Sequence, residues 1–408
     1  MKILFIHHAF PGQFRYLAPK LATLGHEVKA LTEDKPRFPT ANVDVIRYHK
    51  ERKRTEGIHP WLMGTEQKYI RAEAVLNECQ KLSEHDFIPD VVYMHPDWGE
   101  GLFIRDIFPN TKIIIFAEHY YLKENTDASF DPEFADVTLF NHCGAKTNNA
   151  IRLLSLEDCD AAICPTEFQK NNHPSVYHGK MNVIHDGIPT DQLVKNPDIK
   201  IKFRGEINLT KQNDVITFAN RGLEPRRGFH QFMRCIPLLQ QQNPQAHIIV
   251  IGKDVTVYGN YKKLSAGSFK QHMVQELGDR IDYNKVHFVD WLDYASFKSV
   301  IELSTVHVYL TAPFILSWSM LEVMSVEGCI VGSNTAPVTE VIEDGYNGVL
   351  VDFFSPEAIA SKVTELINDK KKRQMIGKNA RQTVIDNYDL NTVCLPRQIE
   401  IIQNIQAG

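Results

Sequence analysis

The stretch VHVYLTAPFILSWSMLEVMSVEGCIVGSN, Val306–Asn334, decides the fold that this sequence predicts. It opens with a β-branched apolar run, Val306–Leu310, and continues through a proline-containing turn, Thr311–Phe314. Helical spacing follows in Trp318–Val326, and a glycine then separates this segment from a second apolar run, Cys329–Gly332. Strand, turn, helix and strand in this order predict one βαβ unit.

Polar residues gather where the helix of this unit begins. Ser317 and Ser319 lie at its first turn, where unpaired backbone N–H groups and the helix dipole favour a phosphate. Glu322 lies about one turn further on, where its carboxylate suits a pair of sugar hydroxyls rather than the phosphate itself. A structural alternative is equally open, because Ser319-Met-Leu-Glu322 fits the capping box S-x-x-E.

Composition limits the kinds of protein that the chain can be. Its 408 residues suggest two or three domains, and 43% hydrophobic with 23% charged residues is normal for a soluble α/β protein. A net charge of −5 gives no reason to expect a nucleic-acid partner. The 7 cysteines form no C-x-x-C pair, which favours free thiols in a reducing cytoplasm. No apolar run reaches the roughly 18 residues of a spanning helix, and the N-terminus is typical of a strand rather than a signal peptide.

The first half begins with a strand, a loop and a helix. The strand Lys2–His7 runs into a loop that contains Gly12, and Tyr16–Leu24 has helical spacing before the next strand, Val28–Thr32. Gly12 thus falls at the carboxyl end of a strand, where parallel sheets bind ligands. The loop lacks G-x-G-x-x-G, so a dinucleotide site is disfavoured.

Two clusters that mix polar and aromatic residues follow later strands of this half. His95 and Trp98 come after the strand Val91–Met94, and Glu118, His119 and Tyr120 come after the strand Ile113–Ala117. Both clusters therefore fall on the ligand edge of the same predicted sheet. A sugar ligand explains the mixture, because aromatic faces pack on pyranose C–H groups while carboxylates bind hydroxyls.

Two charged segments of the first half have competing interpretations. Arg47–Arg54 is a basic cluster, and it is either a solvated loop or a surface for an anionic acceptor or membrane headgroups. Asp158-Cys159-Asp160 matches D-x-D, which is the metal motif of a different transferase fold. It stands between a helical stretch, Ile151–Leu156, and a strand, Ala161–Cys164, so we interpret it as a helix-to-strand corner.

The second half restarts the pattern after a polar segment, 190–213, that has little periodicity. Val215–Ala219 reads as a strand, Asn220–Gly228 as a loop and Phe229–Gln240 as a helix. A further strand ends at Gly252. Residues 255–279 form an insert for which the pattern predicts no element.

At these positions the chain resembles glycosyltransferase family 4, the retaining nucleotide-sugar transferases of the GT-B fold. That family carries two Glu with seven residues between them; Glu322 matches the second, whereas Phe314 stands in place of the first. A basic pair heads its second domain, and Arg221 and Arg227 match that pair with Arg in place of Lys. In the family the first Glu contacts the donor sugar and the second the nucleotide ribose. Two guanidiniums at a strand end would clamp a diphosphate, although a salt-bridged surface loop is the alternative.

Other positions extend the resemblance. Gly12 keeps one of the two glycines of the family's acceptor-side loop. The His that the family commonly places after the matching strand corresponds to Glu118 or His119. Trp291 and Leu292 follow a strand where the family holds the nucleotide base.

The resemblance implies an α/β protein of the GT-B fold, with two Rossmann-like parallel-sheet domains facing each other across a cleft. We expect an acceptor-binding domain at 1–188, a linker at 189–213 and a nucleotide-sugar-binding domain at 214–387, with residues 388–408 packing back on the first domain. The expected donor-binding residues are Gly12, Arg221, Arg227, Gly252, Trp291, Leu292, Phe314, Leu316, Ser317, Trp318, Ser319 and Glu322. The expected catalytic residues are Glu118, His119, Arg221 and Arg227, and the expected acceptor-binding residues are His95, Trp98 and Tyr120.

The implied activity is retaining, metal-independent transfer of a hexose from a nucleotide sugar, expected to be a UDP-hexose such as UDP-glucose, to a glycan or lipid-linked acceptor. Polysaccharide biosynthesis in the cytoplasm, or peripherally at the inner face of the membrane, would use such an enzyme. We expect no cofactor beyond the nucleotide sugar and no nucleic-acid partner. Two rivals stay open: a nucleotide-sugar epimerase of similar fold, and a non-catalytic sugar-nucleotide-binding protein, which Phe314 would favour.

Overall fold

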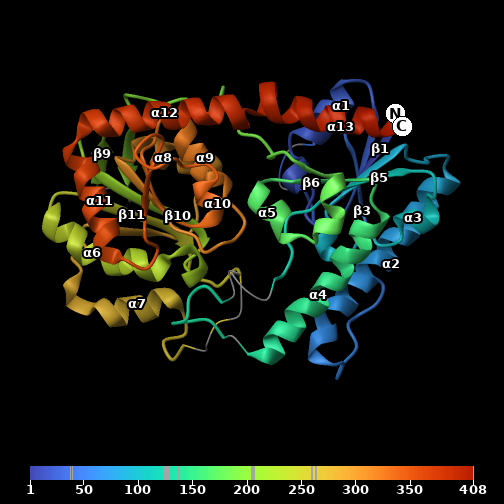
Figure 1. Ribbon diagram of the computed structural model, residues 1–408, viewed down its shortest axis with the longest axis horizontal. Coiled ribbons are helices and arrows are strands. Elements are labelled where there is room, and N and C mark those ends of the chain that lie inside the picture. Colours follow the sequence, from blue (N-terminus) through green and yellow to red (C-terminus); the bar gives the residue numbers. More distant parts are fainter. Residues whose placement is uncertain are drawn as a thin grey trace. The chain divides into compact units, whose positions relative to one another are not determined.

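The computed structural model describes residues 1–36, 38, 40–122, 129–136, 138–203, 207–258, 261 and 264–407. The chain divides into two compact units, and neither is a single continuous segment (Figure 1). Unit 1 comprises Met1–Lys123, Thr138–Gly187 and Leu390–Gly408, and unit 2 comprises Glu124–Val137 and Ile188–Asp389.

Unit 1 is built on a parallel sheet that has, within the described residues, seven strands in the order β3-β2-β1-β4-β5-β6-β7. These strands are β1 (Lys2–Ile6), β2 (Glu27–Thr32), β3 (Asp44–Arg47), β4 (Val91–Met94), β5 (Lys112–Phe116), β6 (Ala161–Cys164) and β7 (Met181–Val183). The chain moves outward from β1 to β3 and then returns to β4 on the other side of β1. The strand order therefore reverses between β1 and β4, and open parallel sheets bind ligands beyond the carboxyl ends of the strands at such a point.

Helices cover the sheet of unit 1. They are α1 (Leu17–Thr23), α2 (Met63–Glu84), α3 (Ile104–Ile107), α4 (Leu139–Asp158), α5 (Glu167–Asn172) and α13 (Leu395–Ala407), with shorter turns η1 (Gly12–Phe14), η2 (Pro60–Leu62), η3 (Pro96–Trp98), η4 (Ser175–Lys180) and η7 (Leu390–Cys394). The C-terminal segment belongs to this unit, because Leu395 and Ile402 are buried in one apolar cluster with Ile3 and Phe5 of β1. Figure 1 shows α13 beside α1.

Unit 2 repeats this plan with a parallel sheet of six strands among the described residues, in the order β12-β11-β10-β13-β14-β15. The strands are β10 (Val215–Gly222), β11 (His247–Lys253), β12 (Val286–Val289), β13 (Val306–Tyr309), β14 (Ile330–Ser333) and β15 (Val349–Val351). Here the strand order reverses between β10 and β13, which pair directly with Ile216 opposite Val306. The prediction of two Rossmann-like parallel-sheet domains is confirmed.

The stretch that decided the fold forms the predicted βαβ unit. Strand β13 leads through a turn into α9 (Trp318–Ser325), and the chain returns along β14. The two strands are parallel neighbours, with His307 opposite Ile330. All four residues of each strand are buried, which explains why both runs are mostly apolar; His307 in β13 and Ser333 in β14 are the buried polar exceptions.

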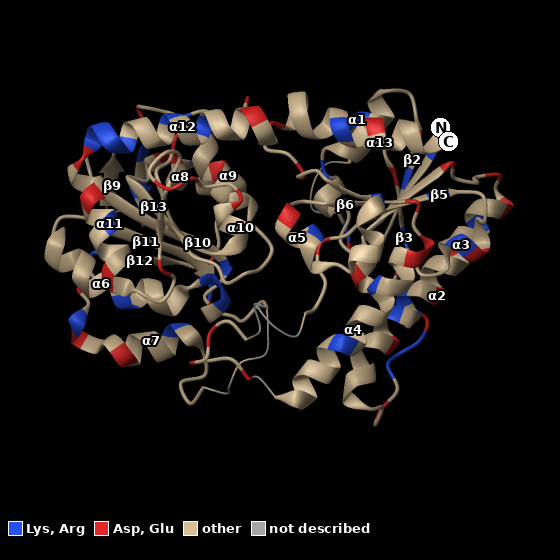
Figure 2. Ribbon diagram, viewed as in Figure 1, with Lys and Arg blue, Asp and Glu red and all other residues tan. Residues whose placement is uncertain are grey.

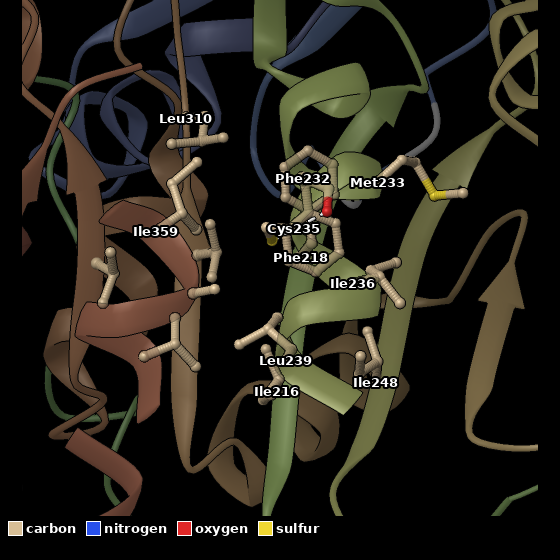
Figure 3. Packing of buried hydrophobic residues seen from close by; sticks show 14 of the residues in the cluster. Ile216, Phe218, Phe232, Met233, Cys235, Ile236, Leu239, Ile248, Leu310 and Ile359 are labelled. Atoms are coloured by element: carbon tan, nitrogen blue, oxygen red, sulfur yellow. Dashed lines mark hydrogen bonds between the residues drawn. The ribbon is translucent and has the colours of Figure 1, made fainter. Parts of the chain in front are cut away.

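The remaining helices of unit 2 enclose its core. They are α6 (Phe229–Gln242), α7 (Phe269–Leu277), α8 (Tyr294–Leu303), α10 (Ala336–Thr339), α11 (Pro356–Asn368) and α12 (Lys370–Tyr388), with turns η5 (Pro225–Arg227) and η6 (Gly278–Arg280). Figure 3 shows α6 packed on β10, where the rings of Phe218 and Phe232 stack with centres 4.5 Å apart. This packing fixes the loop that joins β10 to α6, which carries the predicted basic pair.

Two segments contain more structure than their sequences indicated. The predicted linker at 189–213 contains an antiparallel pair, β8 (Lys200–Phe203) and β9 (Ile207–Thr210), and lies within unit 2. The insert at 255–279 contains α7, whose Phe269 and Met273 are buried in the core of the unit. Short elements that bury only a few side chains leave a weak periodicity in the sequence, which is why the pattern missed them.

The D-x-D segment is a corner, as predicted. Helix α4 ends at Asp158 and β6 begins at Ala161. Asp160 Oδ2 accepts hydrogen bonds from Ile113 N at 2.8 Å and from Arg105 Nη2 at 2.7 Å. Both interactions stabilise the corner itself.

Within the described part of the chain, none of the helices has the length and apolar character needed to cross a bilayer.

Candidate functional site

In unit 2, the loop after β10 and the turn after β13 meet at the point where the strand order reverses. Arg227, the last residue of η5, donates from Nη1 to Thr311 Oγ1 and to the Ile315 carbonyl, each at 2.9 Å. Its side chain is only 7% exposed. The guanidinium is therefore held in one orientation by the turn that follows β13.

Gly228 explains how Arg227 reaches this position. It has a φ of +68°, and a Cβ atom there would lie 2.4 Å from Leu310 Cβ. Only glycine combines this left-handed conformation with such a close approach to the end of β13. The chain can therefore turn from η5 straight into α6 and leave Arg227 against the turn.

Two aromatic rings lie beside the arginines of this loop. The ring centre of Phe314 is 5.1 Å from Arg227 Cζ and 4.6 Å from Arg226 Cζ, which is the range of a cation–π interaction. Tyr258 lies 5.1 Å from Phe314, and its hydroxyl accepts from Arg221 Nη1 at 3.3 Å. The predicted pair is thus connected through an aromatic cluster, with Arg226 as a third guanidinium.

Glu224 fixes the segment that carries Tyr258. Its side chain is buried, and Oε2 accepts from the backbone N–H groups of Val257 at 2.7 Å and Tyr258 at 3.0 Å. Burial raises the pKa of Glu224, and these hydrogen bonds oppose the shift. Sequence reasoning missed Glu224, Arg226 and Tyr258; the dense run of charges before Gly228 was the available signal for the first two.

Arg227 forms no direct ion pair in the described part of the chain, although its charge interacts with the nearby buried carboxylate of Glu224. Its direct contacts include the hydroxyls of Thr311 and Tyr309, the Ile315 carbonyl and two aromatic rings, all of them uncharged. A buried charge is costly unless an opposite charge compensates it. The site therefore has the character of a binding place for an anion.

Helix α9 begins after this turn, and its first residues exclude the capping box suggested for Ser319 and Glu322. Ser317, not Ser319, is the N-cap of α9, and its Oγ accepts from Ser319 N at 3.4 Å. Glu322 consequently lies beyond the position at which a capping box places its carboxylate, so that interpretation is wrong. Glu322 Oε1 instead accepts from the Tyr294 hydroxyl at 2.9 Å, which links α9 to the start of α8.

The other residues expected to bind the donor occupy varied environments. Leu316 is buried, whereas Trp318 is 37% exposed and Trp291 is 68% exposed. Leu292 packs at the edge of an apolar cluster of unit 2. Gly252, at the end region of β11, leaves room for Leu223, whose Cδ2 would lie 2.7 Å from an added Cβ. All of these residues belong to unit 2, while Gly12 belongs to unit 1.

In unit 1, a chain of polar contacts joins the loops that follow β1, β4 and β5. His7 Nε2 lies 2.9 Å from Gln13 Oε1, and Gln13 Nε2 donates to Glu118 Oε1 at 3.0 Å. His95 Nε2 lies 3.4 Å from Glu118 Oε2. Because His7 Nδ1 accepts from Ala9 N, the His7 proton is on Nε2 and is donated to Gln13. The contacts therefore fix the orientation of the Glu118 carboxylate.

Gly12 and Trp98 shape the surroundings of this chain. Gly12 has a φ of +47°, and a Cβ there would lie 2.4 Å from His7 Nε2, so glycine leaves the space that the imidazole needs. The Trp98 ring is 4.5 Å from the His95 ring and 4.9 Å from the His7 ring. Gly12, His95, Trp98 and Glu118 are thus brought together, and His7 and Gln13 join them although sequence reasoning did not select either.

The surroundings of His7 and His95 shift the pKa values of these two side chains in opposite directions. Burial, reinforced by neighbouring His95, lowers the pKa of His7 to about 3. Burial also disfavours the charged form of His95, but its contact with Glu118 and the charge of Asp97 outweigh this effect and raise the pKa of His95. Asp97 is partly buried, yet the Arg152 guanidinium holds the pKa of that carboxyl below its usual range.

His119 and Tyr120 lie on the same loop but make different contacts. The His119 ring is 4.7 Å from Tyr121, and Tyr120 is 5.6 Å from the ring of His173. Asn149 of α4 binds both the N–H and the carbonyl of Tyr121, at 3.0 Å and 2.7 Å. Helix α4 therefore positions this part of the loop, and Glu118, one of the two alternatives, contacts His95.

One group of side chains could in principle hold a metal ion. Ligand atoms of Asp131, Glu133 and His230 lie within 4.8 Å of one another. Both Glu133 oxygens, however, accept from Arg234, at 2.6 Å and 2.8 Å. Asp131 Oδ2 lies 3.1 Å from His230 Nε2. Arg234 thus pairs with Glu133 and His230 contacts Asp131, so the group is satisfied as a structural cluster.

Comparison with known proteins shows that each half of the chain matches a family of glycosyl transferases. Residues 24–193 match the model described as Glycosyl transferase family 4 group, and residues 199–383 match the model described as Glycosyl transferases group 1. Sucrose-phosphate synthase from Thermosynechococcus elongatus has a similar structure, with a TM-score of 0.75 and 16% identity over 100% of both chains. Anabaena HepE in complex with UDP-glucose gives a TM-score of 0.68 and 18% identity, covering 99% of this chain and 100% of its own. These likenesses define a GT-B fold.

The chain belongs to the group 1 glycosyl transferases, with a family 4 domain in its first half. An uncharacterized glycosyltransferase of Methanocaldococcus jannaschii is 24% identical over 255 residues, which is 61% of each chain. The curated relatives are matched over 27% to 61% of their own lengths. The resemblance expected from the sequence is confirmed for the family and the fold.

Proposed function

We propose that this protein transfers a hexose, with retention of anomeric configuration, from a nucleotide sugar to a glycan or lipid-linked acceptor. The observation that carries the proposal is Arg227, a buried guanidinium that forms no direct ion pair among the described residues, at the carboxyl edge of the unit 2 sheet. A diphosphate would supply the missing anion, with Arg221 as a second contact. The UDP-glucose bound to the structurally similar HepE supports a UDP-hexose as donor.

The fixed orientation of Arg227 suits stabilisation of a leaving diphosphate. Negative charge builds on the β-phosphate as the bond between its oxygen and the sugar C1 breaks. Thr311 and Ile315 hold the guanidinium before that charge develops, so little reorganisation is needed during the reaction. In this proposal the arginines supply the positive charge that a divalent metal supplies in other transferases.

Retention follows if the acceptor approaches on the face from which the diphosphate departs. The acceptor hydroxyl oxygen forms the new bond to C1, and its proton passes to the departing phosphate oxygen. The unit 1 residues would then bind rather than attack. The Glu118 carboxylate, oriented by Gln13, accepts from sugar hydroxyls, and Trp98 offers an aromatic face. We place this activity in polysaccharide biosynthesis in the cytoplasm.

A donor screen tests the proposal. The protein is incubated with UDP- and GDP-hexoses and a mixture of glycan and glycolipid acceptors, and nucleotide release is measured alongside the anomeric signals of the product. We expect acceptor-dependent UDP release, a product with the donor's configuration, and equal rates in excess chelator and in magnesium. A rate that collapses in chelator and returns with Mn²⁺ would contradict metal independence.

Phe314 gives specific support to a second candidate, a protein that binds sugar nucleotides without turnover. The residue that contacts the donor sugar in the family is a Glu, and here an apolar ring that is only 4% exposed replaces it. Donor binding with no release of nucleotide under any acceptor would favour this candidate. Isomerised sugar after incubation with donor alone would indicate an epimerase instead.

A further inference from the structure

One connection of the chain contributes to both units. It joins β5 to α4, carries Glu118 within unit 1, and supplies Glu124–Val137 to unit 2 before the chain returns to unit 1 at Thr138. The structure describes residues 129–136 of this excursion. A segment that leaves its own sheet gives up conformational freedom, so contacts within unit 2 must hold it in place.

Two phenylalanines hold residues 129–136, the anchored segment, in unit 2. Phe134 is 4% exposed and belongs to the apolar core of the unit. Its ring meets Phe269 of α7 and His230 of α6 edge-on, with ring centres 5.3 Å and 5.2 Å apart. The Phe130 ring stacks on Phe354, with ring centres 5.0 Å apart. Removal of these rings from water stabilises the packing of the segment on the unit.

Two carboxylates of the anchored segment contact the same part of unit 2. Glu133 accepts from Arg234 of α6 at 2.6 Å and 2.8 Å, and this guanidinium also donates to Glu276 of α7 at 2.7 Å and 2.8 Å. Figure 2 shows both acidic and basic residues on α7. Asp131 Oδ2 lies 3.1 Å from Nε2 of His230, whose side chain is fully buried. The segment is therefore fixed by a bidentate ion pair as well as by aromatic packing.

The anchored segment borders the loop that carries the candidate arginines. Ala135 pairs antiparallel with Tyr261, and the Tyr261 hydroxyl accepts from Arg226 N at 3.2 Å. On the other flank, His230 lies three residues beyond Arg227, at the start of α6. The segment therefore contacts both neighbours of the basic loop, Tyr261 and the first turn of α6.

We propose that residues 129–136 position the basic loop of unit 2 for a diphosphate. With the segment in place, Tyr261 and the start of α6 keep Arg226 and Arg227 in the orientation that the ligand needs. Coupling of this kind is reciprocal, so a bound diphosphate also stabilises the segment in its place. The inference rests on the proposed function for the identity of the ligand, whereas the support given to the loop exists without it.

Titration with UDP and amide hydrogen exchange on the full chain test this role. In Phe134→Ala we expect UDP affinity to fall about fivefold or more with uridine affinity unchanged, and the Arg226 amide to exchange faster. Phe134→Leu keeps an apolar side chain and should recover most of the loss. Glu133→Ala removes only the ion pair, so it should fold even if Phe134→Ala does not, and should lose up to about fivefold in UDP affinity. Saturating UDP should slow amide exchange in residues 129–136 of the wild type.

Two controls separate positioning from general stability. Leu366→Ala opens a cavity in the same apolar core but on α11, and Glu276→Ala removes the other carboxylate that binds Arg234. Both should bind UDP as the wild type does. Equal loss of UDP affinity in the controls, or wild-type UDP affinity in both Phe134→Ala and Glu133→Ala, would overturn the inference.

The same measurements distinguish this inference from the proposed function. A wild-type chain that binds no nucleoside diphosphate would contradict the proposed function, and amide exchange would then decide the role of residues 129–136. Faster exchange at Arg226 in Phe134→Ala and Glu133→Ala, but not in the controls, would support positioning of the loop. Exchange at Arg226 that is the same in the variants and the wild type would overturn it.

Discussion

The guanidinium carbon of Arg227 lies 5.1 Å from the ring centre of Phe314, and the same guanidinium is bound by the residues on either side of that turn, Thr311 and Ile315. Phe314 occupies the position at which the family carries a Glu. A ring attracts the cation without cancelling its charge, whereas a carboxylate would form an ion pair with it. The substitution therefore keeps the positive charge of Arg227 available to a ligand.

Restoring the acidic residue should consequently weaken nucleotide binding. In Phe314→Glu, the new carboxylate would compete with the diphosphate for the guanidinium, and we expect UDP affinity to fall by about tenfold or more. Phe314→Leu is the control, because it keeps an apolar side chain in the same place and should stay within about tenfold of the wild type. Calorimetric titration measures both. Undiminished UDP affinity together with faster transfer in Phe314→Glu would show that the ring has no such role.

Glu118 should affect transfer more strongly than donor binding. Glu118→Ala removes the carboxylate and also leaves Gln13 and His95 without their common partner. We expect a lower kcat with UDP affinity unchanged, and a smaller loss in His119→Ala, whose ring packs on Tyr121. Steady-state rates and UDP titrations on each variant separate the two effects. Normal transfer by both variants would place the acceptor elsewhere.

The buried Glu100 carboxyl should make the free energy of unfolding decrease as the pH rises. Burial raises the pKa of Glu100 to about 7, and the Tyr48 hydroxyl, which donates to it at 2.7 Å, opposes the shift. From about pH 4.5 to 7 the folded chain keeps a proton that the unfolded chain releases, so folding loses up to about 3 kcal/mol over this window. Glu100→Gln keeps an acceptor for Tyr48 without this loss. Its Tm advantage over the wild type should thus grow between pH 5 and pH 8; an advantage that is the same at both would refute the argument.

Glu322 should contribute to ribose binding rather than to helix stability. Glu322→Gln retains an oxygen for the Tyr294 hydroxyl, so Tm should change little. A carboxylate accepts from two hydroxyls at once and an amide from one, so we expect UDP-sugar affinity to fall about 10- to 150-fold. Tyr294→Phe is the control, because it removes only the contact between α8 and α9. If both variants bind donor like the wild type, Glu322 is a structural residue.

The sequence predicted most of the architecture because both sheets are parallel and buried. Val306–Leu310 and Lys2–His7 read as strands since parallel strands are buried on both faces and therefore mostly apolar, as β13 and β1 are. The order of such runs predicted two sheets, and both were found. The β8–β9 pair escaped prediction, because its strands mix polar with apolar residues and lack the continuous apolar run of the buried parallel strands.

The candidate sites were predictable only in part. Residues in the loops that follow strands, such as Arg227, Glu118 and His95, could be selected because the carboxyl edge of a parallel sheet is known in advance. Tyr258 reaches the unit 2 site from an irregular segment, held there by Glu224, and no local pattern predicts such a contact. The N-cap of α9 stayed open for a related reason: Ser317 and Ser319 both fit a cap, and only the observed backbone distinguishes them.

The most direct measurement compares UDP and uridine as ligands of the wild type and of Arg227→Ala by calorimetric titration, with Arg280→Ala as a control at an exposed arginine. If Arg227 binds the diphosphate, the variant should lose about tenfold or more in affinity for UDP and none for uridine, and kcat should fall by about 10²-fold. Equal UDP affinity in the wild type and Arg227→Ala would contradict the account, since the buried guanidinium would then have some purpose other than anion binding.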